Sequence, residues 1–300
     1  MMNIRLLKNK DIDILKWDKR VSSSQNARVY ALSWFLDIAC PGWYGLVCDD
    51  YRYVMPVCVA SKYGFRYAYQ PVYAQQHGIF PLANADIADG FMSVLQQNFR
   101  FFEIQVNGCF PLKDNRLELE EKANYLLDLN RAYDDIYGTY SADCRRNMKR
   151  AARVNVIKPG VEPELLFRLK KEHSRLPLDD KTFAMLEGIA RAAVQRECGF
   201  VRAAYTNDGE PTGAALFIRF GQRILYLNAV SSPKGKKNRS MYAILNSVIE
   251  EYSGSSLMLD FEGSIVPGIA KFFAGFGAKP EYYQKIKYNN LPFLLKKLKK

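Results

Sequence analysis

Histidine is nearly absent from this sequence. Its 300 residues contain only two histidines, His77 and His173. A zinc site built from several histidines is therefore excluded, and a Ser-His-Asp triad would have to use one of these two side chains. The general base of any reaction at this protein would then be a carboxylate, a tyrosine or an ordered water molecule.

Paired cysteines and long apolar runs are also missing. None of the six cysteines belongs to a Cys-x-x-Cys pair, which favours reduced core residues over a redox or metal site. No apolar run approaches the ~20 residues of a membrane span, and the first residues lack the apolar core of a signal peptide. We therefore expect no metal, no integral membrane segment and a cytoplasmic protein.

Positive charge, in contrast, is abundant. The formal net charge is +12, and part of the excess is clustered in "CRRNMKRAAR" (144–153), "SPKGKKNR" (232–239) and "LLKKLKK" (294–300). Such a balance favours anionic partners, for example phosphates, nucleotides, RNA or an anionic substrate. The alternative is that the charge serves solubility alone.

The second half of the chain has a readable order of elements. Residues 162–173 and 179–197 show helical periodicity, and residues 199–206, 211–220 and 223–232 alternate as three antiparallel strands. A basic loop precedes a helix over 241–252. A strand over 257–262, a helix between Pro267 and Gly277 and a strand over 282–288 follow.

The first half repeats this order. Helical patterns at 11–20 and 27–40 precede a three-strand meander over 43–71, a loop over 72–81, a helix over 87–99 and strands at 101–108 and 124–130. Tyr69 and Tyr226 both end a third meander strand, and Gly78 and Gly235 follow them at equal spacing. We therefore predict an internal duplication of mixed α/β class, with one domain over 1–135 and a second over 136–300.

A basic helix is predicted between the two halves. Cys144, Met148 and Ala151 form a thin apolar stripe, and the opposite face is cationic. Arg145 and Arg146 on that face are candidates for binding an anionic substrate. A solvated linker helix is the alternative interpretation.

This layout resembles the GNAT acyltransferase fold, and two copies in one chain resemble the FemABX-like, or Fem-type, tandem arrangement. The resemblance rests on "TYSADCRRNMKRA", "QPVYAQQHGIF" and "LDFEGSIVPGIAKFFAGFGA" and covers nearly the whole chain. It implies two splayed parallel strands that hold an activated acyl donor. A loop and helix N-terminus that face the donor's pyrophosphate are also implied.

The resemblance also suggests what each half binds. The donor would be an acyl-CoA or an aminoacyl-tRNA, held mainly by the second half. Fem-type proteins extend a peptidoglycan precursor, so the acceptor would be an amine, for example on an anionic cell-wall precursor, in the first half and the groove between domains. Candidate donor-binding residues are Tyr226, Asn228, Gly235, Lys236, Lys237, Arg239 and Ser240.

The chemistry needs a base for the amine and a donor for the oxyanion. Asp260 and Glu262 alternate on one face of a predicted strand beside the expected cleft, although a salt bridge or a helix cap would also explain them. Tyr283 follows the last helix, where the family often places a general-acid tyrosine. Candidate acceptor-binding residues in the first half are Tyr69, Gln70, Gln75 and Gln76.

The resulting expectation is an enzyme, an N-acyltransferase that moves an acyl or aminoacyl group from a thioester or ester to an amine. Two alternatives remain open: an acetyl-CoA-dependent N-acetyltransferase of small molecules, and a degenerate tandem domain that binds an anionic ligand without chemistry.

Overall fold

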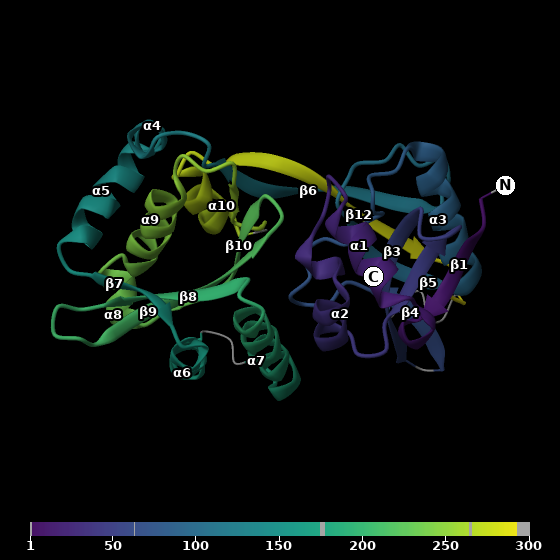
Figure 1. The fold of residues 1–300 in the computed structure, drawn as a ribbon, viewed down its shortest axis with the longest axis horizontal. Helices are drawn as coiled ribbons and strands as arrows, with labels where there is room; N and C mark the ends of the chain where they lie inside the picture. Colours follow the sequence, from purple (N-terminus) through teal and green to yellow (C-terminus); the bar gives the residue numbers. More distant parts are fainter. Residues whose placement is uncertain (1, 63, 175–177, 264–265, 293–300) are drawn as a thin grey trace. The chain divides into compact units, whose positions relative to one another are not determined.

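The computed structural model describes residues 2–62, 64–174, 178–263 and 266–292, so the basic tail at 294–300 lies outside the described residues. The chain forms two compact units (Figure 1). Unit 1 contains residues 1–122 and 282–300, and unit 2 contains residues 123–281. Among the described residues, no helix is long and apolar enough to cross a membrane.

Unit 1 is an α/β unit whose strands follow the order β1-β2-β3-β4-β5-β12-β6. Strands β4 and β5 are parallel, and β5 pairs antiparallel with β12. The elements are β1 (Ile4–Lys8), η1 (Asn9–Asp11), α1 (Ile14–Ser22), η2 (Val29–Ala31), α2 (Ser33–Ala39), β2 (Tyr44–Cys48), β3 (Tyr53–Lys62), β4 (Phe65–Tyr69), α3 (Ala85–Asn98), β5 (Phe101–Val106), the start of β6 (Leu117–Asp128) and most of β12 (Lys279–Asn289).

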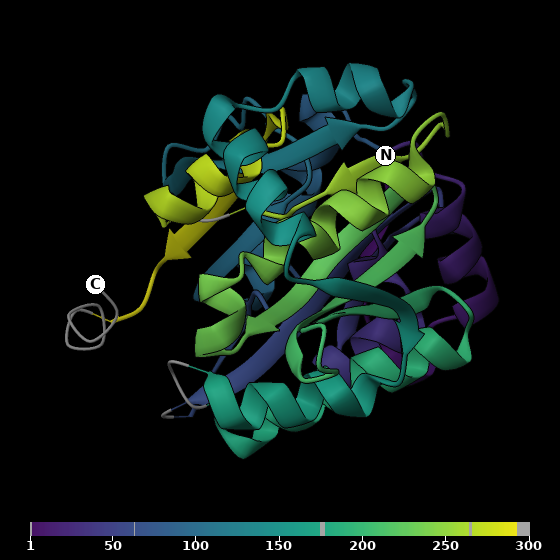
Figure 2. The same cartoon turned by 90° about the vertical axis from the view of Figure 1, so that its left-hand side faces the viewer.

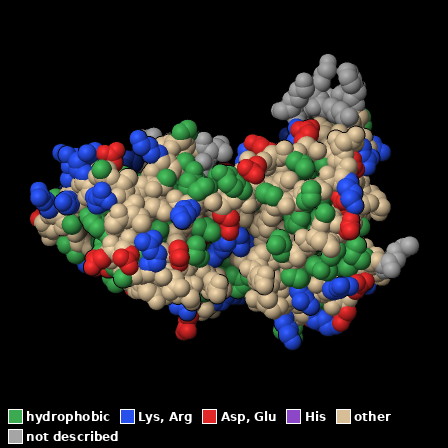
Figure 3. Space-filling model, turned by 90° about the horizontal axis from the view of Figure 1, so that it is seen from above, with side chains coloured by type: hydrophobic (Ala, Val, Ile, Leu, Met, Phe, Trp, Pro, Cys, Tyr) green, Lys and Arg blue, Asp and Glu red, His purple; other side chains and the backbone are tan. Residues whose placement is uncertain are grey.

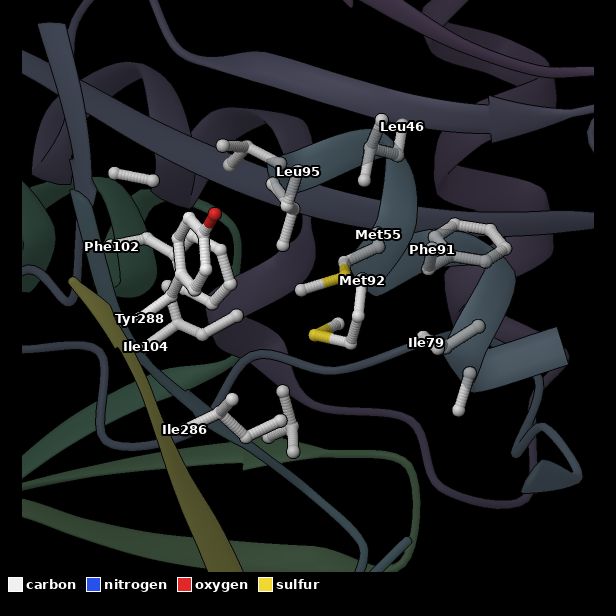
Figure 4. Close-up of a cluster of buried hydrophobic side chains, with 14 of the residues drawn as sticks. Leu46, Met55, Ile79, Phe91, Met92, Leu95, Phe102, Ile104, Ile286 and Tyr288 are labelled. Carbon is white, nitrogen blue, oxygen red and sulfur yellow. The ribbon is translucent and has the colours of Figure 1, made fainter. Parts of the chain in front are cut away.

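The main core of unit 1 lies between α3 and one face of its sheet. Phe91, Met92 and Leu95 of α3 pack on the sheet, where alternate strand residues are apolar (Figure 4). Among these strand residues are Leu46, Phe102, Ile104 and Ile286. The other face is covered by α1 at its β2 end, because a side chain at Gly45 would meet the ring of Trp17.

Unit 2 repeats this order of elements, with strands in the order β7-β8-β9-β10-β11-β6-β12. Strands β10 and β11 are parallel, and β11 pairs antiparallel with β6. Its elements are α4 (Tyr133–Gly138), α5 (Ala142–Ala152), β7 (Val156–Val161), α6 (Pro163–His173), α7 (Asp180–Gln195), β8 (Gly199–Tyr205), β9 (Pro211–Phe220), β10 (Arg223–Ser231), α8 (Pro233–Lys237), α9 (Ser240–Tyr252), β11 (Met258–Asp260) and α10 (Pro267–Ala274).

Helices cover both faces of the sheet in unit 2. Helices α5, α9 and α10 pack on one face around Phe217, Leu259 and Phe261. Helices α6 and α7 lie on the other face, so that the green strands separate them from α9 (Figure 2). Two sets of side chains therefore leave the strands in opposite directions, and the register of each strand decides which set a residue joins.

The two strand orders are the same once the strands are matched by position. The first five strands of each order come from one half of the chain, and the sixth strand comes from the other half: β12 in unit 1 and β6 in unit 2. Strands β6 and β12 each contain a boundary between the units, so both appear in both orders. This exchange is why the compact units divide the chain at other residues than the predicted boundary at 135/136. The mixed α/β class is confirmed, and the duplication as an origin of the fold stays a prediction.

Several local expectations hold and others need correction. The basic helix of the linker is confirmed as α5, and the helices predicted at 162–173 and 179–197 are α6 and α7. The stretch predicted as a basic loop contains the short helix α8, and strands β1 and β7 were not expected. Strands β1 and β7 lie at the two ends of the strand order. Edge strands often contain charged residues, so the alternation of apolar residues in their sequences is weak.

Candidate functional site

The opening between the parallel strands is closed in unit 1. Among the residues that the structure describes, strands β4 and β5 pair at Ala68–Phe102 and Tyr69–Glu103 and nowhere else. Beyond them the chain inserts residues 77–80: the amide of His77 donates to the carbonyl of Gln105 (2.8 Å), and Phe80 exchanges two backbone bonds with Val54 of β3 (2.8 and 2.9 Å). A segment of the protein itself thus occupies the place where a GNAT fold would hold a donor.

Gly78 is what permits this insertion. Its φ of +143° is one that side-chain-bearing residues rarely adopt, and an added Cβ would lie 1.8 Å from Oδ1 of Asn107. His77 and Gln76 beside it are buried, each with about 1% exposure. The loop "AQQHGIF" therefore has a structural role, and its buried glutamine is not on the surface of a substrate cavity.

Unit 2 has no comparable insertion among the described residues. Strands β10 and β11 pair over Arg223–Leu225 and Met258–Asp260, and β10 then continues alone on that side to Ser231. A β-bulge lies between Tyr226 and Asn228, which bends the strand. Among the described residues, this side of β10 is therefore unpaired beyond Leu225, and we call this gap in the strand pairing the opening of unit 2.

Asp260 stands at the end of β11 and is committed to an ion-pair cluster. Its carboxylate lies 2.9 Å from Nη1 of Arg223 and accepts bonds from Nδ2 of Asn124 (3.0 Å) and from the amide of Glu262 (3.0 Å). Arg223 also binds Glu281 at 2.6 Å. Asp260 is 3% exposed, whereas the side chain of Glu281 is 33% exposed, so the Asp260 end of this cluster is shielded from water.

Glu262 does not continue the alternation that the sequence suggested. The strand ends at Asp260, and Glu262 adopts a φ of +60° while its carbonyl accepts from the amide of Tyr125 (3.3 Å). The side chains of Asp260 and Glu262 are therefore not two successive members of one strand face. Tyr283, the third residue predicted to be catalytic, is buried in β12 and belongs to unit 1.

The bulge in β10 separates the two predicted donor residues Tyr226 and Asn228. Tyr226 packs beneath α9 against Phe261 and Phe273, its hydroxyl 3.4 Å from Sδ of Met241, and burial raises the pKa of this phenol. Asn228 is on the other face and accepts a bond from Nζ of Lys170. The two side chains therefore lie on opposite faces of the sheet although they are two residues apart, because the bulge adds one residue to β10.

Tyr226 also does not occupy the position of Tyr69. Tyr69 follows Ala68, which belongs to the core under α3, and so points to the opposite face of its sheet. The two tyrosines are equally far from the next glycine in the sequence, but their side chains do not occupy equivalent positions in the two units.

The segment 232–240 is held in place by hydrogen bonds within the segment and to neighbouring residues of unit 2. Ser232 caps α8 by accepting from the amide of Gly235 (3.0 Å), and a Cβ at Gly235 would lie 2.0 Å from the carbonyl oxygen of Thr212. Ser240 is buried and hydrogen-bonded to Thr212 (2.9 Å) and Asn155 (2.8 Å). Of the predicted donor-binding residues in this segment, only Lys236, Lys237 and Arg239 expose side chains that a ligand could reach.

A cavity of about 780 Å³ lies on the open part of the sheet in unit 1. Tyr69 and Gln70 line it as predicted, whereas Gln75 and Gln76 do not, because Gln76 is buried and bonded to Gln75 (2.8 Å). The remaining lining residues are Tyr67, Phe101, Glu103, Gln105, Glu118, Leu119, Glu120, Lys285 and Lys287.

Charged residues of both signs cross this cavity from strand to strand. Lys285 lies 2.9 Å from Glu103 and 3.9 Å from Glu120, and Lys287 lies 3.0 Å from Glu118. Tyr67 and Phe101 pack edge to face, with ring centroids 6.3 Å apart, and supply an apolar side. The alternation in "FFEIQV", "LELEEK" and "YQKIKY" carried the signal for these residues, but only the pairing of β5, β12 and β6 brings them together.

The second prominent hollow is cationic and lies in unit 2. A groove of about 650 Å³ runs between α5, the start of α9 and α10, lined by Arg146, Arg150, Arg239 and Lys271 with Tyr242 and Phe272. Further along α5, a hollow of about 410 Å³ is lined by Arg145, Lys149 and Arg153 as well. Figure 3 shows Lys and Arg side chains gathered on the part of the surface that α5 forms.

The two predicted substrate-binding arginines, Arg145 and Arg146, differ in burial and in their hydrogen-bond partners. Arg145 is partly buried and donates to the carbonyls of Gly138 (3.3 Å) and Tyr140. Arg146 is exposed and forms an ion pair with Asp143 one turn earlier on α5. Arg146 can therefore reorient toward a ligand at small cost, whereas Arg145 mainly fixes the start of α5.

The sequence matches no family model and no curated protein. Solved structures do match. FemX aligns over 98% of this chain and 99% of its own, with a TM-score of 0.69 at 11% identity. The chain has the fold of FemX. A conserved protein of unknown function from Bacteroides thetaiotaomicron aligns over 95% of this chain and 99% of its own (TM-score 0.61, 11% identity).

L-PGS from Bacillus licheniformis also aligns, over 88% of this chain and 89% of its own (TM-score 0.53, 12% identity). At these identities the likeness concerns the fold. The FemABX-like tandem GNAT fold predicted from the sequence is thus confirmed.

Proposed function

We propose that this protein is an N-acyltransferase that uses unit 2 to hold an activated acyl donor and the cavity of unit 1 to hold an amine acceptor. The observation that carries the proposal is the asymmetry between the two units. The parallel strands of unit 1 are closed by residues 77–80, whereas β10 of unit 2 runs past the end of its pairing with β11. Within the part of the chain that the structure describes, unit 2 alone leaves this position between its parallel strands unfilled, and the proposed donor would bind there.

The donor that fits best is an aminoacyl ester of RNA. Four cations, Arg146, Lys149, Arg150 and Arg153, follow one side of α5 over about 10 Å, which is longer than one pyrophosphate and comparable to successive phosphates of a strand. In the turn before α9, the amide of Gly235 already donates to the hydroxyl of Ser232, and Gly235 packs against the backbone of Thr212. Acyl-CoA remains the second candidate donor, favoured by exposed Lys236, Lys237 and Arg239 near the start of α9.

The cavity of unit 1 suits an acceptor with charged groups of both signs and an apolar part. Glu103, Glu118 and Glu120 can bind an ammonium, and Lys285 and Lys287 can bind a carboxylate or phosphate. A peptide that ends in an amine, such as the peptide of a cell-wall precursor, has this chemistry.

The experiment is a transfer assay with labelled donors. Aminoacyl-tRNA and acetyl-CoA are each incubated with the protein and a muropeptide acceptor, and amide product is counted. The R146E/R150E variant should lose most transfer from aminoacyl-tRNA, and the salt dependence of its RNA affinity should weaken. The K8E/K19E variant changes the net charge equally at exposed residues of unit 1 and serves as the control.

A second function has one observation in its favour. Asp260 is fully engaged with Arg223 and Asn124, so it is not a free base as it stands. A protein that binds a polyanion without chemistry would show RNA binding by native protein, loss of binding in R146E/R150E, and no amide product from any donor. That combination would overturn the acyltransferase proposal.

A further inference from the structure

Lys170 lies on the face of helix α6 where the helical periodicity predicts apolar residues. Leu166, Phe167 and Leu169 of α6 are buried against the sheet of unit 2. Lys170 lies one turn after Leu166 and Phe167, and its side chain is on the same inward side. A lysine stem can cover apolar surface there, but its ammonium loses much of its contact with water.

The bulge of β10 supplies the partner of this ammonium. Because the register shifts between Tyr226 and Asn228, the amide of Asn228 faces α6, and its Oδ1 accepts a hydrogen bond of 2.6 Å from Nζ of Lys170. An amide oxygen is neutral. It satisfies one of the three N–H donors and leaves the charge without a counter-ion. Burial lowers the pKa of Lys170 to about 8.

Other shielded cations of unit 2 have carboxylate partners. Arg202 forms an ion pair with Glu251, and Arg223 forms ion pairs with Asp260 and Glu281. Within the described residues, no carboxylate lies within 4 Å of Nζ of Lys170. A partly buried cation without a counter-ion is costly, so an anion that binds beside Lys170 would gain from supplying the missing charge.

The position of the pair suggests that reason. Asn228 stands on the part of β10 that extends beyond the pairing with β11, where the sheet of unit 2 is open. We propose that Lys170, oriented by Asn228, binds an oxyanion, either a carboxylate or a phosphate group, of a molecule that enters this opening. The oxyanion would supply the missing counter-charge and two acceptors for the remaining N–H donors of the ammonium.

Binding of an oxyanion at Lys170 does not depend on the proposed reaction, so it can be tested without turnover. The native full-length chain is labelled with ¹³C at the ε-carbons of its lysines, and the Lys170 signal is identified by its absence from K170M. The signal is titrated with pH in chloride, in inorganic phosphate and in N-acetylglycine, at equal ionic strength. Binding of either anion should raise the pKa of the Lys170 ammonium by about one unit or more, a tenfold preference for the charged form.

The two anions separate the two sources of the oxyanion. A response to N-acetylglycine alone assigns a substrate carboxylate, and a response to phosphate alone assigns a phosphate group. In N228A the response should weaken several-fold, because the ammonium is no longer held in place. The exposed Lys181 of α7 is the control signal and should not move.

The proposal is overturned if the Lys170 signal follows the control signal in both anions. If K170M fails to fold, K170R identifies the same signal and the titration of the native chain still decides. Absence of acyl transfer in the assay above would leave this result untouched, since the titration measures binding alone.

Discussion

The guanidinium of Arg223 lies 2.9 Å from the carboxylate of Asp260, and both side chains are largely shielded from water. The two residues come from neighbouring parallel strands, and Asn124 and Glu281 complete the cluster. A carboxylate that the sequence proposed as a base is thus first of all one half of a buried ion pair. Any loss of activity on changing Asp260 must be separated from loss of stability.

Asp260→Asn should lower the free energy of unfolding by about 3 kcal/mol, since removing one partner of a buried pair leaves the other charge poorly compensated. Glu118→Gln removes one partner of the exposed pair with Lys287 and should cost less than about 1 kcal/mol. Urea unfolding of both variants measures the difference. Equal effects of the two changes would contradict the structural role of Asp260.

Gly78→Ala should destabilise unit 1 by several kcal/mol, roughly the cost of overpacking combined with backbone strain. The added methyl group would have to displace Asn107, whose Oδ1 lies 1.8 Å from the position of the new Cβ. Gly138→Ala is the matched control, because nothing lies within 4 Å of its Cβ and its φ is not positive. Thermal unfolding compares the two, and a Gly78→Ala protein as stable as the control would show that residues 77–80 do not close the sheet as described.

Gly235→Ala tests whether the turn before α9 is built for the fold or for a ligand. Its Cβ would lie 2.0 Å from the carbonyl oxygen of Thr212, so we expect destabilisation of about 2 kcal/mol or more with no ligand present. Lys236→Ala and Lys237→Ala remove exposed side chains and should change stability by less than about 0.5 kcal/mol. An unaltered melting temperature for Gly235→Ala, with weaker donor binding, would assign the glycine to the ligand instead.

Acid should destabilise the protein through His77. Burial lowers the pKa of this imidazole to about 3, below its ordinary 6.5, so the unfolded chain binds more protons than the folded chain between these values. Stability is therefore complete above pH 6.5 and is lost as the pH falls toward 3, by as much as about 4 kcal/mol. In His77→Gln the slope of unfolding free energy against pH should be shallower in this window, as measured by urea unfolding at several pH values. Identical slopes would rule out His77 as the cause.

The cost of the uncompensated Lys170 ammonium should appear as a pH-dependent difference between native protein and K170M. The pKa of about 8 is below the ordinary 10.5 of lysine, so the folded chain binds fewer protons between pH 8 and 10.5 and stability rises with pH there. K170M should therefore be more stable than native protein by about 3 kcal/mol at pH 7, and the advantage should vanish by pH 10.5. Lys181→Met, on the exposed side of α7, should show no such dependence; a K170M protein less stable than native at pH 7 would contradict the account.

Much of the fold follows from local pattern, and much of the site does not. The helices α5, α6, α7 and α9 are readable from apolar spacing, and the meander strands from alternation, because each pattern repeats within a few residues. The cavity of unit 1 was found only in part: Tyr69 and Gln70 lie on the expected strand end, but Glu103 and Lys285 come from strands separated by most of the chain. Their meeting depends on which strand pairs with which.

The sequence alone determined the fold class, the tandem order of elements, the scarcity of histidine and the basic face of α5, since these depend on composition and short-range periodicity. Tertiary structure decided that unit 1 fills its own opening, that Asp260 is paired, and that Asn228 faces Lys170. Each of these depends on strand register or on contacts between distant segments, and one bulged residue is enough to move a side chain to the other face of a sheet.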